Sequence, residues 1–296
     1  MKKVILESPF AGDVEGNVNY ARGCLRDCLL RNEAPIASHL LYTQPGVLDD
    51  NNPDERKLGI EAGLLWGSGA EKSVVYLDRG ISSGMKWGIE RAGKEGRPVE
   101  YRTLHPIKIM TITGASGAGK TSIASELLRL KPDRKLVISL TTRDPRPSDL
   151  PGEYRCNVPI AEFEESTKFI WVVSAHSNRY GTLLESVNTA LAEETLRAMI
   201  LVPEAVGLLR KHTKTKREGS VLSFYLLSPP EEELRRRMKL RGEDEATIEK
   251  RIKDCKEWDE EARRSDTPYI FVSNNVDKEA EIGIGKTARE ILMYLS

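Results

Sequence analysis

The fold is decided by one uninterrupted stretch near the middle of the chain, Gly114-Ala115-Ser116-Gly117-Ala118-Gly119-Lys120-Thr121. This stretch matches the pattern G-x-x-x-x-G-K-[ST] at every position. The apolar run Ile107–Ile112 before it predicts a buried strand, and the apolar residues Ile123, Leu127 and Leu130 after it predict a helix. A glycine turn between a strand and a helix lets backbone N–H groups surround phosphate oxygens. The stretch therefore predicts a phosphate-binding loop in an α/β domain.

Three chemical uses follow from the residues of this loop. The backbone of residues 114–121 is the expected ATP-binding set. Lys120 can neutralise charge on the β- and γ-phosphates as a phosphoryl group moves, so it is the expected catalytic cation. The Thr121 hydroxyl is the expected Mg²⁺ ligand, which makes ATP and Mg²⁺ the predicted cofactors. The alternative is a glycine turn beside a chance lysine, and the flanking strand and helix disfavour it.

Further motifs follow the loop in a fixed order. The first is Ser139-Leu140-Thr141-Thr142-Arg143-Asp144-Pro145-Arg146, which leads to Gly152-Glu153-Tyr154. After it come Ser177-Asn178-Arg179-Tyr180-Gly181-Thr182, the arginine-bearing segment Leu234–Gly242, and Ile270-Phe271-Val272-Ser273-Asn274-Asn275. In this order they resemble the guanylate kinase motifs S-x-T-T-R-x-P-R and N-Y-Y-G-T, the lid, and V-x-V-N-D. The resemblance covers residues 106–296 and implies a P-loop kinase domain with a helical lid.

The resemblance implies a site for a monophosphate acceptor. Arg143 and Arg146 offer forked donors that suit a dianionic phosphate. The full acceptor set implied is Ser139, Arg143, Arg146, Tyr154, Trp171, Tyr180, Thr182 and Glu204. The lid is expected to cover the transferring group with three catalytic arginines, Arg237, Arg241 and Arg251. The alternative for these arginines is a solvated helix face, since Glu231–Glu233 precede them.

One departure from this family concerns the acceptor base. Where the family's F-x-E-H-A segment holds a glutamate that accepts guanine N–H groups, this chain has Trp171. An indole has one N–H donor and no acceptor, so it cannot take guanine's two donors. Glu204 also replaces the aspartate of the family's I-D-x-Q-G. We expect a (deoxy)nucleoside monophosphate with a non-guanine or modified base; the alternatives are an ordinary guanylate kinase acting on GMP or dGMP, with Trp171 in the core, and a nucleotide-sensing module without catalysis.

Length and charge limit the organisation of the chain. Its 296 residues favour two domains, and the short connection at 103–106 predicts a first domain of residues 1–104 and a second of 105–296. Lys and Arg number 45, and so do Asp and Glu, which gives no overall attraction to nucleic acid or to anionic membranes. No apolar run is long enough to span a membrane. Cys24 and Cys28 share a helical face, and we expect them to pack in the core of a reduced, cytoplasmic protein.

The first domain is predicted to be a small, doubly wound, parallel-sheet α/β domain. Its expected strands are Lys3–Leu6, Pro35–Leu41, Ser73–Leu77 and Pro98–Tyr101, and Gly84–Ala92 is an expected helix. Asn17 is the expected N-cap of the first helix. In order, the segments Glu7–Gly12, Ala37–Leu40 and Val75–Met85 resemble nucleoside 2-deoxyribosyltransferase-like proteins of phages and bacteria. The resemblance implies a nucleoside or nucleotide pocket.

Ligands of such sheets bind where the strands end. The pocket expected there contains Ser8, Pro9, Phe10, His39, Asp78, Ser82, Ser83, Gly84 and Glu90. Asp78 can accept sugar hydroxyls or cap a loop, and His39 can be a site donor or a structural histidine. The resemblance places the transferase's glutamate nucleophile at Gly88, with Glu90 as the nearest carboxylate. The domain is therefore expected to bind, or to cleave or remake, the N-glycosidic bond of a nucleotide.

Together these features predict a two-domain enzyme of nucleotide metabolism. The expected partners are small-molecule nucleotides, with no direct nucleic-acid or membrane binding, and a homo-oligomer is allowed. The fusion of the two domains favours supply of unusual DNA precursors, as phages need, in the cytoplasm of a bacterial host.

Overall fold

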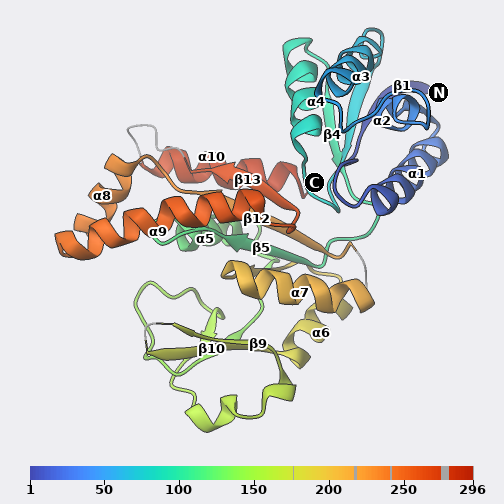
Figure 1. Cartoon of the computed structure of the whole chain (residues 1–296). Coiled ribbons are helices and arrows are strands. Elements are labelled where there is room, and N and C mark those ends of the chain that lie inside the picture. Colours follow the sequence, from blue (N-terminus) through green and yellow to red (C-terminus); the bar gives the residue numbers. More distant parts are fainter. Residues whose placement is uncertain (176, 217–218, 241, 275–279, 296) are drawn as a thin grey trace. The chain divides into compact units, whose positions relative to one another are not determined.

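The chain folds into two compact units, Met1–His105 and Pro106–Leu295 (Figure 1). The computed structural model describes residues 1–175, 177–216, 219–240, 242–274 and 280–295. Among these residues, no helix is both long enough and apolar enough to cross a membrane.

The N-terminal unit is built on a four-stranded parallel sheet of order β2-β1-β3-β4. Its strands are β1 (Lys2–Glu7), β2 (Glu33–Ile36), β3 (Lys72–Tyr76) and β4 (Val99–Arg102). Its helices are α1 (Val14–Leu30), α2 (Ser38–Tyr42), α3 (Pro53–Leu65) and α4 (Ser83–Lys94). The expected strand Pro35–Leu41 is wrong beyond Ile36, because the chain turns there into α2.

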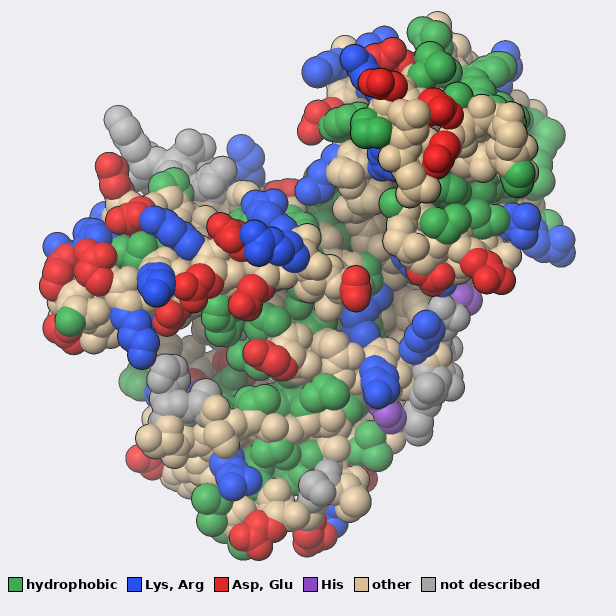
Figure 2. Space-filling view, viewed as in Figure 1, with side chains coloured by type: hydrophobic (Ala, Val, Ile, Leu, Met, Phe, Trp, Pro, Cys, Tyr) green, Lys and Arg blue, Asp and Glu red, His purple; other side chains and the backbone are tan. Residues whose placement is uncertain are grey.

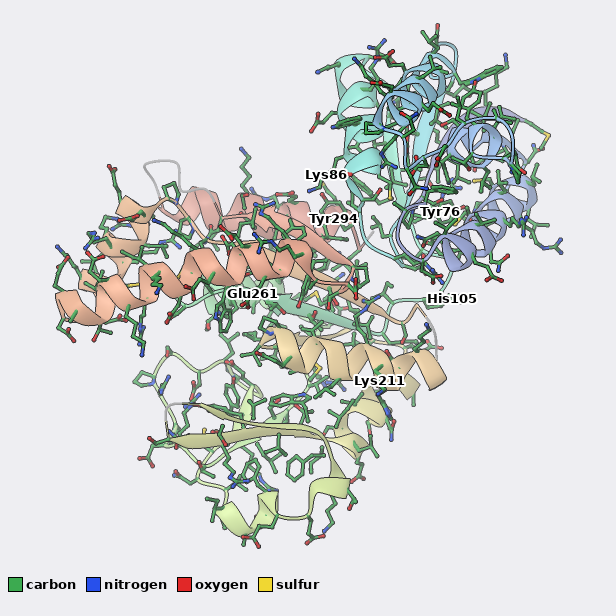
Figure 3. All side chains as sticks on the ribbon, in the orientation of Figure 1. Tyr76, Lys86, His105, Lys211, Glu261 and Tyr294 are labelled. Carbon is green, nitrogen blue, oxygen red and sulfur yellow. The ribbon has the colours of Figure 1, made fainter. Side chains whose placement is uncertain are left out.

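The core of this unit lies between the sheet and α1. Tyr76, labelled in Figure 3, is fully buried. It packs with Cys24 and Cys28. Both cysteines are free thiols in an apolar cluster, as expected. The Tyr76 hydroxyl donates to Asp27 at 2.6 Å, which satisfies its only polar group.

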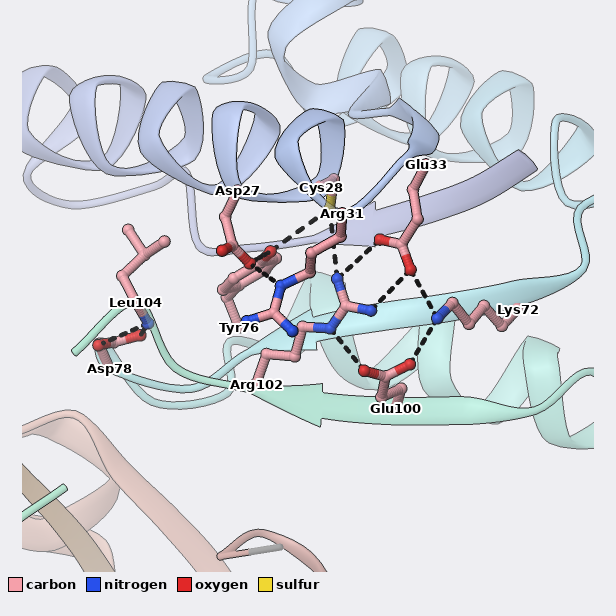
Figure 4. A network of polar contacts seen from close by, with 10 residues as sticks. All are labelled: Asp27, Cys28, Arg31, Glu33, Lys72, Tyr76, Asp78, Glu100, Arg102 and Leu104. Carbon is pink, nitrogen blue, oxygen red and sulfur yellow. Dashed lines mark hydrogen bonds and ion pairs between the residues drawn. The ribbon is translucent and has the colours of Figure 1, made fainter. Parts of the chain in front are cut away.

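A network of charged groups joins three of the strands (Figure 4). Arg102 of β4 donates to both carboxylate oxygens of Glu33 of β2, at 2.7 and 2.8 Å. Lys72 of β3 lies 2.6 Å from Glu33 and 2.6 Å from Glu100. Hydrogen bonds from Arg102 lower the pKa of the Glu33 carboxyl to about 2. Since the Glu33 and Arg102 side chains are both almost fully buried, their charges depend on this network, in which Arg102 also lies 2.7 Å from Glu100.

The C-terminal unit contains a five-stranded parallel sheet of order β13-β12-β5-β11-β6. Its strands are β5 (Ile109–Thr113), β6 (Lys135–Leu136), β11 (Arg197–Ile200), β12 (Val221–Leu227) and β13 (Tyr269–Ser273). The helices of the unit are α5 (Lys120–Leu130), α6 (Leu184–Ala192), α7 (Pro203–Lys216), α8 (Glu231–Leu240), α9 (Glu245–Arg264) and α10 (Ala280–Met293). The central strand β5 is buried at every residue, so the loop that follows it starts from a rigid base.

A second sheet of this unit has the order β8-β7-β10-β9. Its elements are β7 (Ser139–Thr141), β8 (Tyr154–Arg155), the short 3₁₀ turns at Ile160–Phe163 and Ser166–Lys168, β9 (Phe169–Ala175) and β10 (Asn178–Leu183). On one face of this sheet Leu140 of β7 packs with Phe163. The opposite face carries Ser139, Tyr154 and Thr182, because strand partners in register point to the same side.

Candidate active site

The phosphate-binding loop needs glycine at defined positions. Gly114, Gly117 and Gly119 have φ values of 151°, 84° and 103°, in the region that favours glycine. A Cβ atom at Gly114 would lie 2.4 Å from the backbone oxygen of Leu226. One at Gly119 would lie 2.5 Å from Nδ2 of Asn274. The loop therefore holds a conformation that side chains at these positions would block.

Neighbouring elements brace this loop. Lys120 donates from Nζ to the backbone oxygens of Gly114 and Ala115, at 2.6 and 2.8 Å, so its ammonium group lies over the first half of the loop. Asn274 donates from Nδ2 to the oxygen of Ala118 at 3.1 Å. The Cys255 thiol lies 3.3 Å from the oxygen of Ser116. Sequence reasoning assigned no role to Cys255, because only the folded chain brings α9 to the loop.

Two of the three predicted lid arginines reach the loop. Arg237 of α8 donates from Nη1 to the backbone oxygen of Gly117 at 3.1 Å. Arg251 of α9 lies 3.3 Å from the Ser116 hydroxyl. Glutamates hold both: Glu233 bonds Arg237 and Glu243 bonds Arg251, each at 2.7 Å. The third, Arg241, lies outside the described residues.

The neighbouring arginines of α8 lie on a charged surface. Figure 2 shows basic and acidic side chains intermixed over α8 and α9. Arg235 and Arg236 pair there with glutamates of their own helix or of α9. The sequence alone does not separate them from Arg237, since the three are consecutive.

A cleft runs from the loop to the second motif. Lys120, Thr121, Arg146, Glu243 and Arg251 all line it. Among the described residues, no group of three His, Cys, Asp or Glu side chains is placed to hold a metal ion. A Mg²⁺ ion held by the Thr121 hydroxyl and by nucleotide phosphates fits such a site, because Mg²⁺ needs few protein ligands when phosphates supply the others.

The predicted phosphate donors of the acceptor site are arranged differently from expectation. Arg143 is buried, and both of its Nη atoms donate to Asp149, at 2.8 and 2.6 Å. Its guanidinium also lies 4.8 Å from the centre of the Tyr154 ring. Tyr154 in turn meets Tyr180 edge to face, with ring centres 6.1 Å apart. In this conformation the Arg143 fork is therefore taken by Asp149, whereas Arg146 lines the cleft, and the role of Arg143 as a phosphate donor stays a prediction.

The base end of the predicted site is enclosed. The Ser139 and Thr182 hydroxyls share a hydrogen bond of 2.7 Å, and Trp171 pairs with Thr182 across the sheet. The Trp171 side chain is 6% exposed and belongs to the apolar core with Ala205 of α7. Its indole N–H has no hydrogen-bond acceptor among the described residues. Glu204 is exposed at the start of α7 and does not line the cleft.

The N-terminal unit contains a separate cavity of about 140 Å³ where β1 ends. It is lined by six of the predicted residues, Ser8, Phe10, His39, Ser82, Ser83 and Gly84. Pro9, Asp78 and Glu90 do not line it. The structure agrees with the loop-capping alternative for Asp78. Its carboxylate accepts from the Tyr20 hydroxyl at 2.6 Å and from the Leu104 amide at 2.9 Å, the contact drawn in Figure 4. It caps the chain as it leaves the unit.

Sequence reasoning assigned no role to Glu7, which lines the cavity together with Asp50 and Glu55. Glu7 is the last residue of β1, and a Cβ atom at Gly88 would lie 2.0 Å from its Oε1. Gly88 is the position where the resemblance placed a glutamate nucleophile. A charged residue at the end of an apolar strand was the available signal, and it was passed over for residues further along the loop.

Comparisons with known proteins divide the chain in the same two parts. Residues 2–102 match a family described as a domain of unknown function (DUF7768), so the deoxyribosyltransferase resemblance is not confirmed and stays a prediction. Residues 107–282 match the family described as guanylate kinase.

Curated relatives of the second part include two bacterial guanylate kinases. That of Rhizobium meliloti (strain 1021) is 33% identical over 186 residues, which cover 60% of this chain and 82% of the relative. That of Caldanaerobacter subterraneus subsp. tengcongensis is 33% identical over 58% of this chain and 82% of its own. The crystal structure of guanylate kinase from Anaplasma phagocytophilum is 21% identical, with a TM-score of 0.40 over 64% of this chain and 85% of that one.

Proposed function

Because this chain belongs to the guanylate kinase family, we propose that its C-terminal unit transfers the γ-phosphoryl group of ATP to GMP or dGMP. The chain is a nucleoside monophosphate kinase, and the proposal concerns its acceptor and the roles of its residues. The observation that carries it is one cleft lined by the glycine loop, by Arg146 of the acceptor motif and by Arg251 of the lid. A phosphoryl donor and a phosphate acceptor have to meet at such a place.

The chain's own groups supply charge and position at the phosphates. The backbone amides of the loop and the N-terminus of α5 bind phosphate oxygens. Lys120 leaves the backbone oxygens of its own loop and turns to the phosphates, since a phosphate is the stronger partner for an ammonium group. Arg237 and Arg251 lie next to the loop and stabilise charge as transfer proceeds. The Thr121 hydroxyl would hold Mg²⁺, which would supply positive charge at the nucleotide phosphates.

The acceptor phosphate is held on the other side of the cleft. Arg146 makes the first contact, because its side chain lines the cleft and its backbone amide already bonds Asp149. Arg143 then releases Asp149 and binds the acceptor phosphate, while its guanidinium stays packed over the Tyr154 ring. In this scheme Asp149 is the group that keeps Arg143 ordered before the acceptor binds.

A second candidate, a non-guanine or modified base, is favoured by one observation. Trp171 stands where a carboxylate acceptor would bind guanine, and its buried N–H has no acceptor among the described residues. A base that offers an acceptor at this edge would satisfy that donor, whereas guanine N–H groups would find none. Ser139 and Thr182 remain as hydroxyl partners for either base.

An ADP-release assay with a panel of acceptors tests both candidates. The panel contains GMP, dGMP, AMP, CMP, UMP, dTMP and base-modified deoxynucleotides at equal concentration, with ATP and Mg²⁺. We expect the highest kcat/KM with GMP or dGMP. A higher kcat/KM with a nucleotide of another base would show that this nucleotide is the acceptor. Lys120→Met is the catalytic control and should lower kcat at least about 100-fold. ADP release that needs no acceptor, or none with any acceptor, would refute the kinase proposal.

A further inference from the structure

We propose that the cavity of the N-terminal unit binds an uncharged nitrogen heterocycle of nucleobase size through the carboxyl group of Glu7. This site belongs to the unit whose matched family has no assigned function, and it goes beyond phosphoryl transfer. Its volume of about 140 Å³ is close to the roughly 150 Å³ of protein cavities that hold one benzene ring. The space is therefore sufficient for one flat ring system and too small for a whole nucleotide inside it.

The walls of the cavity suit a flat, apolar face. Phe10, Leu48, Ile60, Leu64 and Met85 come to it from four segments of the unit. Apolar walls of this kind favour the face of an aromatic ring over a sugar, whose hydroxyls would lose water without new partners.

The cavity is also lined by the carboxyl group of Glu7. Glu7 has no hydrogen-bond or ion-pair partner among the residues that the structure describes. Gly88 of α4 makes room for it, since any Cβ there would lie 2.0 Å from Oε1. Burial raises the pKa of Glu7 to about 8, although Arg97 acts in the opposite direction. A neutral carboxyl offers one donor and one acceptor side by side, which matches an adjacent N–H and ring nitrogen or carbonyl of a heterocycle.

The cations near the cavity are already engaged, which disfavours a phosphate or another anion. Arg56 pairs with Asp50. Arg97 donates to the Gly67 carbonyl at 2.8 Å and to Glu95 at 2.6 Å. Neither guanidinium can turn to an anionic ligand without leaving a carboxylate behind.

A hydrogen-bonded pair in the wall is also neutral. The Ser8 hydroxyl and His39 Nε2 share a hydrogen bond of 2.9 Å. Burial lowers the pKa of His39 to about 4, so the imidazole is uncharged near neutral pH. With a neutral acid and a neutral imidazole, the cavity selects an uncharged ligand.

The test measures binding of free heterocycles to the full chain. The probes are uracil, cytosine, adenine and hypoxanthine, each titrated at pH 6.5 and followed by ligand-observed NMR and calorimetry. The variants alter only the N-terminal unit. Any weak binding of a probe in the kinase cleft is therefore the same in every variant and does not affect the comparison between them. Circular dichroism and kinase turnover of each variant show whether the chain is folded.

The variants separate hydrogen bonding from shape. Glu7→Leu and Gly88→Ala should weaken binding of the best probe about tenfold or more, because they remove the carboxyl or displace it. Glu7→Gln, whose amide keeps one donor side and one acceptor side, should stay within about threefold. Gly93→Ala is the matched control on the same helix, since a Cβ there meets nothing within 4 Å, and it should bind as the wild type does.

Three results would overturn the proposal. The first is that none of the four probes binds at millimolar concentration. The second is that Glu7→Leu binds as well as the wild type in a folded chain. The third is that Glu7→Gln loses binding while an alkylammonium probe binds the wild type, which would show an ionised Glu7 and a cationic ligand instead.

Discussion

Arg237 Nη1 donates to the backbone oxygen of Gly117 at 3.1 Å, although 120 residues separate them in the chain. This contact places the lid helix α8 on the phosphate loop. One turn before it on the same helix, Glu233 accepts from Arg237 Nε at 2.7 Å. The side chain of Arg237 is thus fixed at two points, and its free rotation is largely removed before any phosphate arrives.

Removing Glu233 should therefore slow catalysis more than it weakens ATP binding. We expect Glu233→Ala to lower kcat about tenfold and to change KM for ATP by less than about threefold, because Arg237 loses its fixed position. The measurement is steady-state ADP release. Glu232→Ala, on the exposed side of the same turn, is the control. An equal loss in both variants would mean that helix stability, and not Arg237, is responsible.

The loop glycines give a second prediction. Gly119 has φ of 103°, and a Cβ there would lie 2.5 Å from Nδ2 of Asn274. Gly119→Ala should cost about 1–2 kcal/mol of stability from the backbone alone and should abolish detectable turnover. Gly207→Ala in α7 meets nothing within 4 Å and should leave turnover unchanged. Turnover of Gly119→Ala above about a tenth of the wild type would show that the loop relaxes around a side chain.

Local motifs predicted the phosphate loop and the strand before it, because their conformation depends on neighbouring residues. The contacts that failed prediction are those between distant segments. Asp78 was expected in a ligand site, but folding brings Tyr20 and Leu104 to it. Asn17 was the expected helix cap, whereas Asp13 caps α1 and Asn17 bonds the backbone of the preceding loop.

The same distinction applies to the cavity and to the lid. Helix α3 was not predicted, since its apolar residues are interrupted by glycines that face the cavity. Glu7 and Gly88 meet only when β1 packs beside α4. Arg236 and Arg237 are neighbours on α8, but Arg236 bonds Glu233 whereas Arg237 reaches the backbone oxygen of Gly117. The packing of the helix decides this difference.

Substitution of Trp171 tests whether its side chain only fills the core or also contacts the acceptor base. We expect Trp171→Phe to lower stability by about 1–2 kcal/mol, because a smaller ring leaves space in the core with Ala205. The ratio of kcat/KM for GMP to that for AMP should change by less than about threefold. A larger change in this ratio, with the fold intact by circular dichroism, would favour the non-guanine acceptor.

The Glu33–Arg102 pair predicts acid sensitivity of the N-terminal unit. The pKa of the Glu33 carboxyl is about 2 in the folded chain and ordinarily 4.5. The stabilisation is therefore present above pH 4.5 and is lost as the pH falls towards 2. Glu33→Gln should flatten the acid dependence of stability and destabilise the unit by about 1–3 kcal/mol at pH 7. Arg102 then loses its charged partner Glu33 and keeps only Glu100, which lies 2.7 Å from its Nε. Hydrogen exchange of the β3 amides reports the unit's opening. Glu61→Gln, in an exposed pair with Lys57, should do neither.

Glu7 predicts the opposite dependence on pH. Its folded pKa of about 8 lies above the ordinary 4.5, so the native state keeps a proton that the unfolded chain releases, and stability falls as the pH rises from 4.5 to 8. Arg97 opposes this shift, and the other titratable or charged side chains lining the cavity are His39, Tyr42, Asp50, Glu55 and Arg56.

The range from pH 6.5 to 8 isolates Glu7 from His39. The pKa of His39 is about 4 when folded and ordinarily 6.5, so above pH 6.5 the imidazole is mainly neutral in both states. In that range the wild type should lose protection of the β1 amides relative to Glu7→Gln, measured by hydrogen exchange of both proteins at each pH. Parallel curves for the two proteins would mean that Glu7 is ionised in the native state, and the neutral carboxyl on which ligand selection depends would be absent.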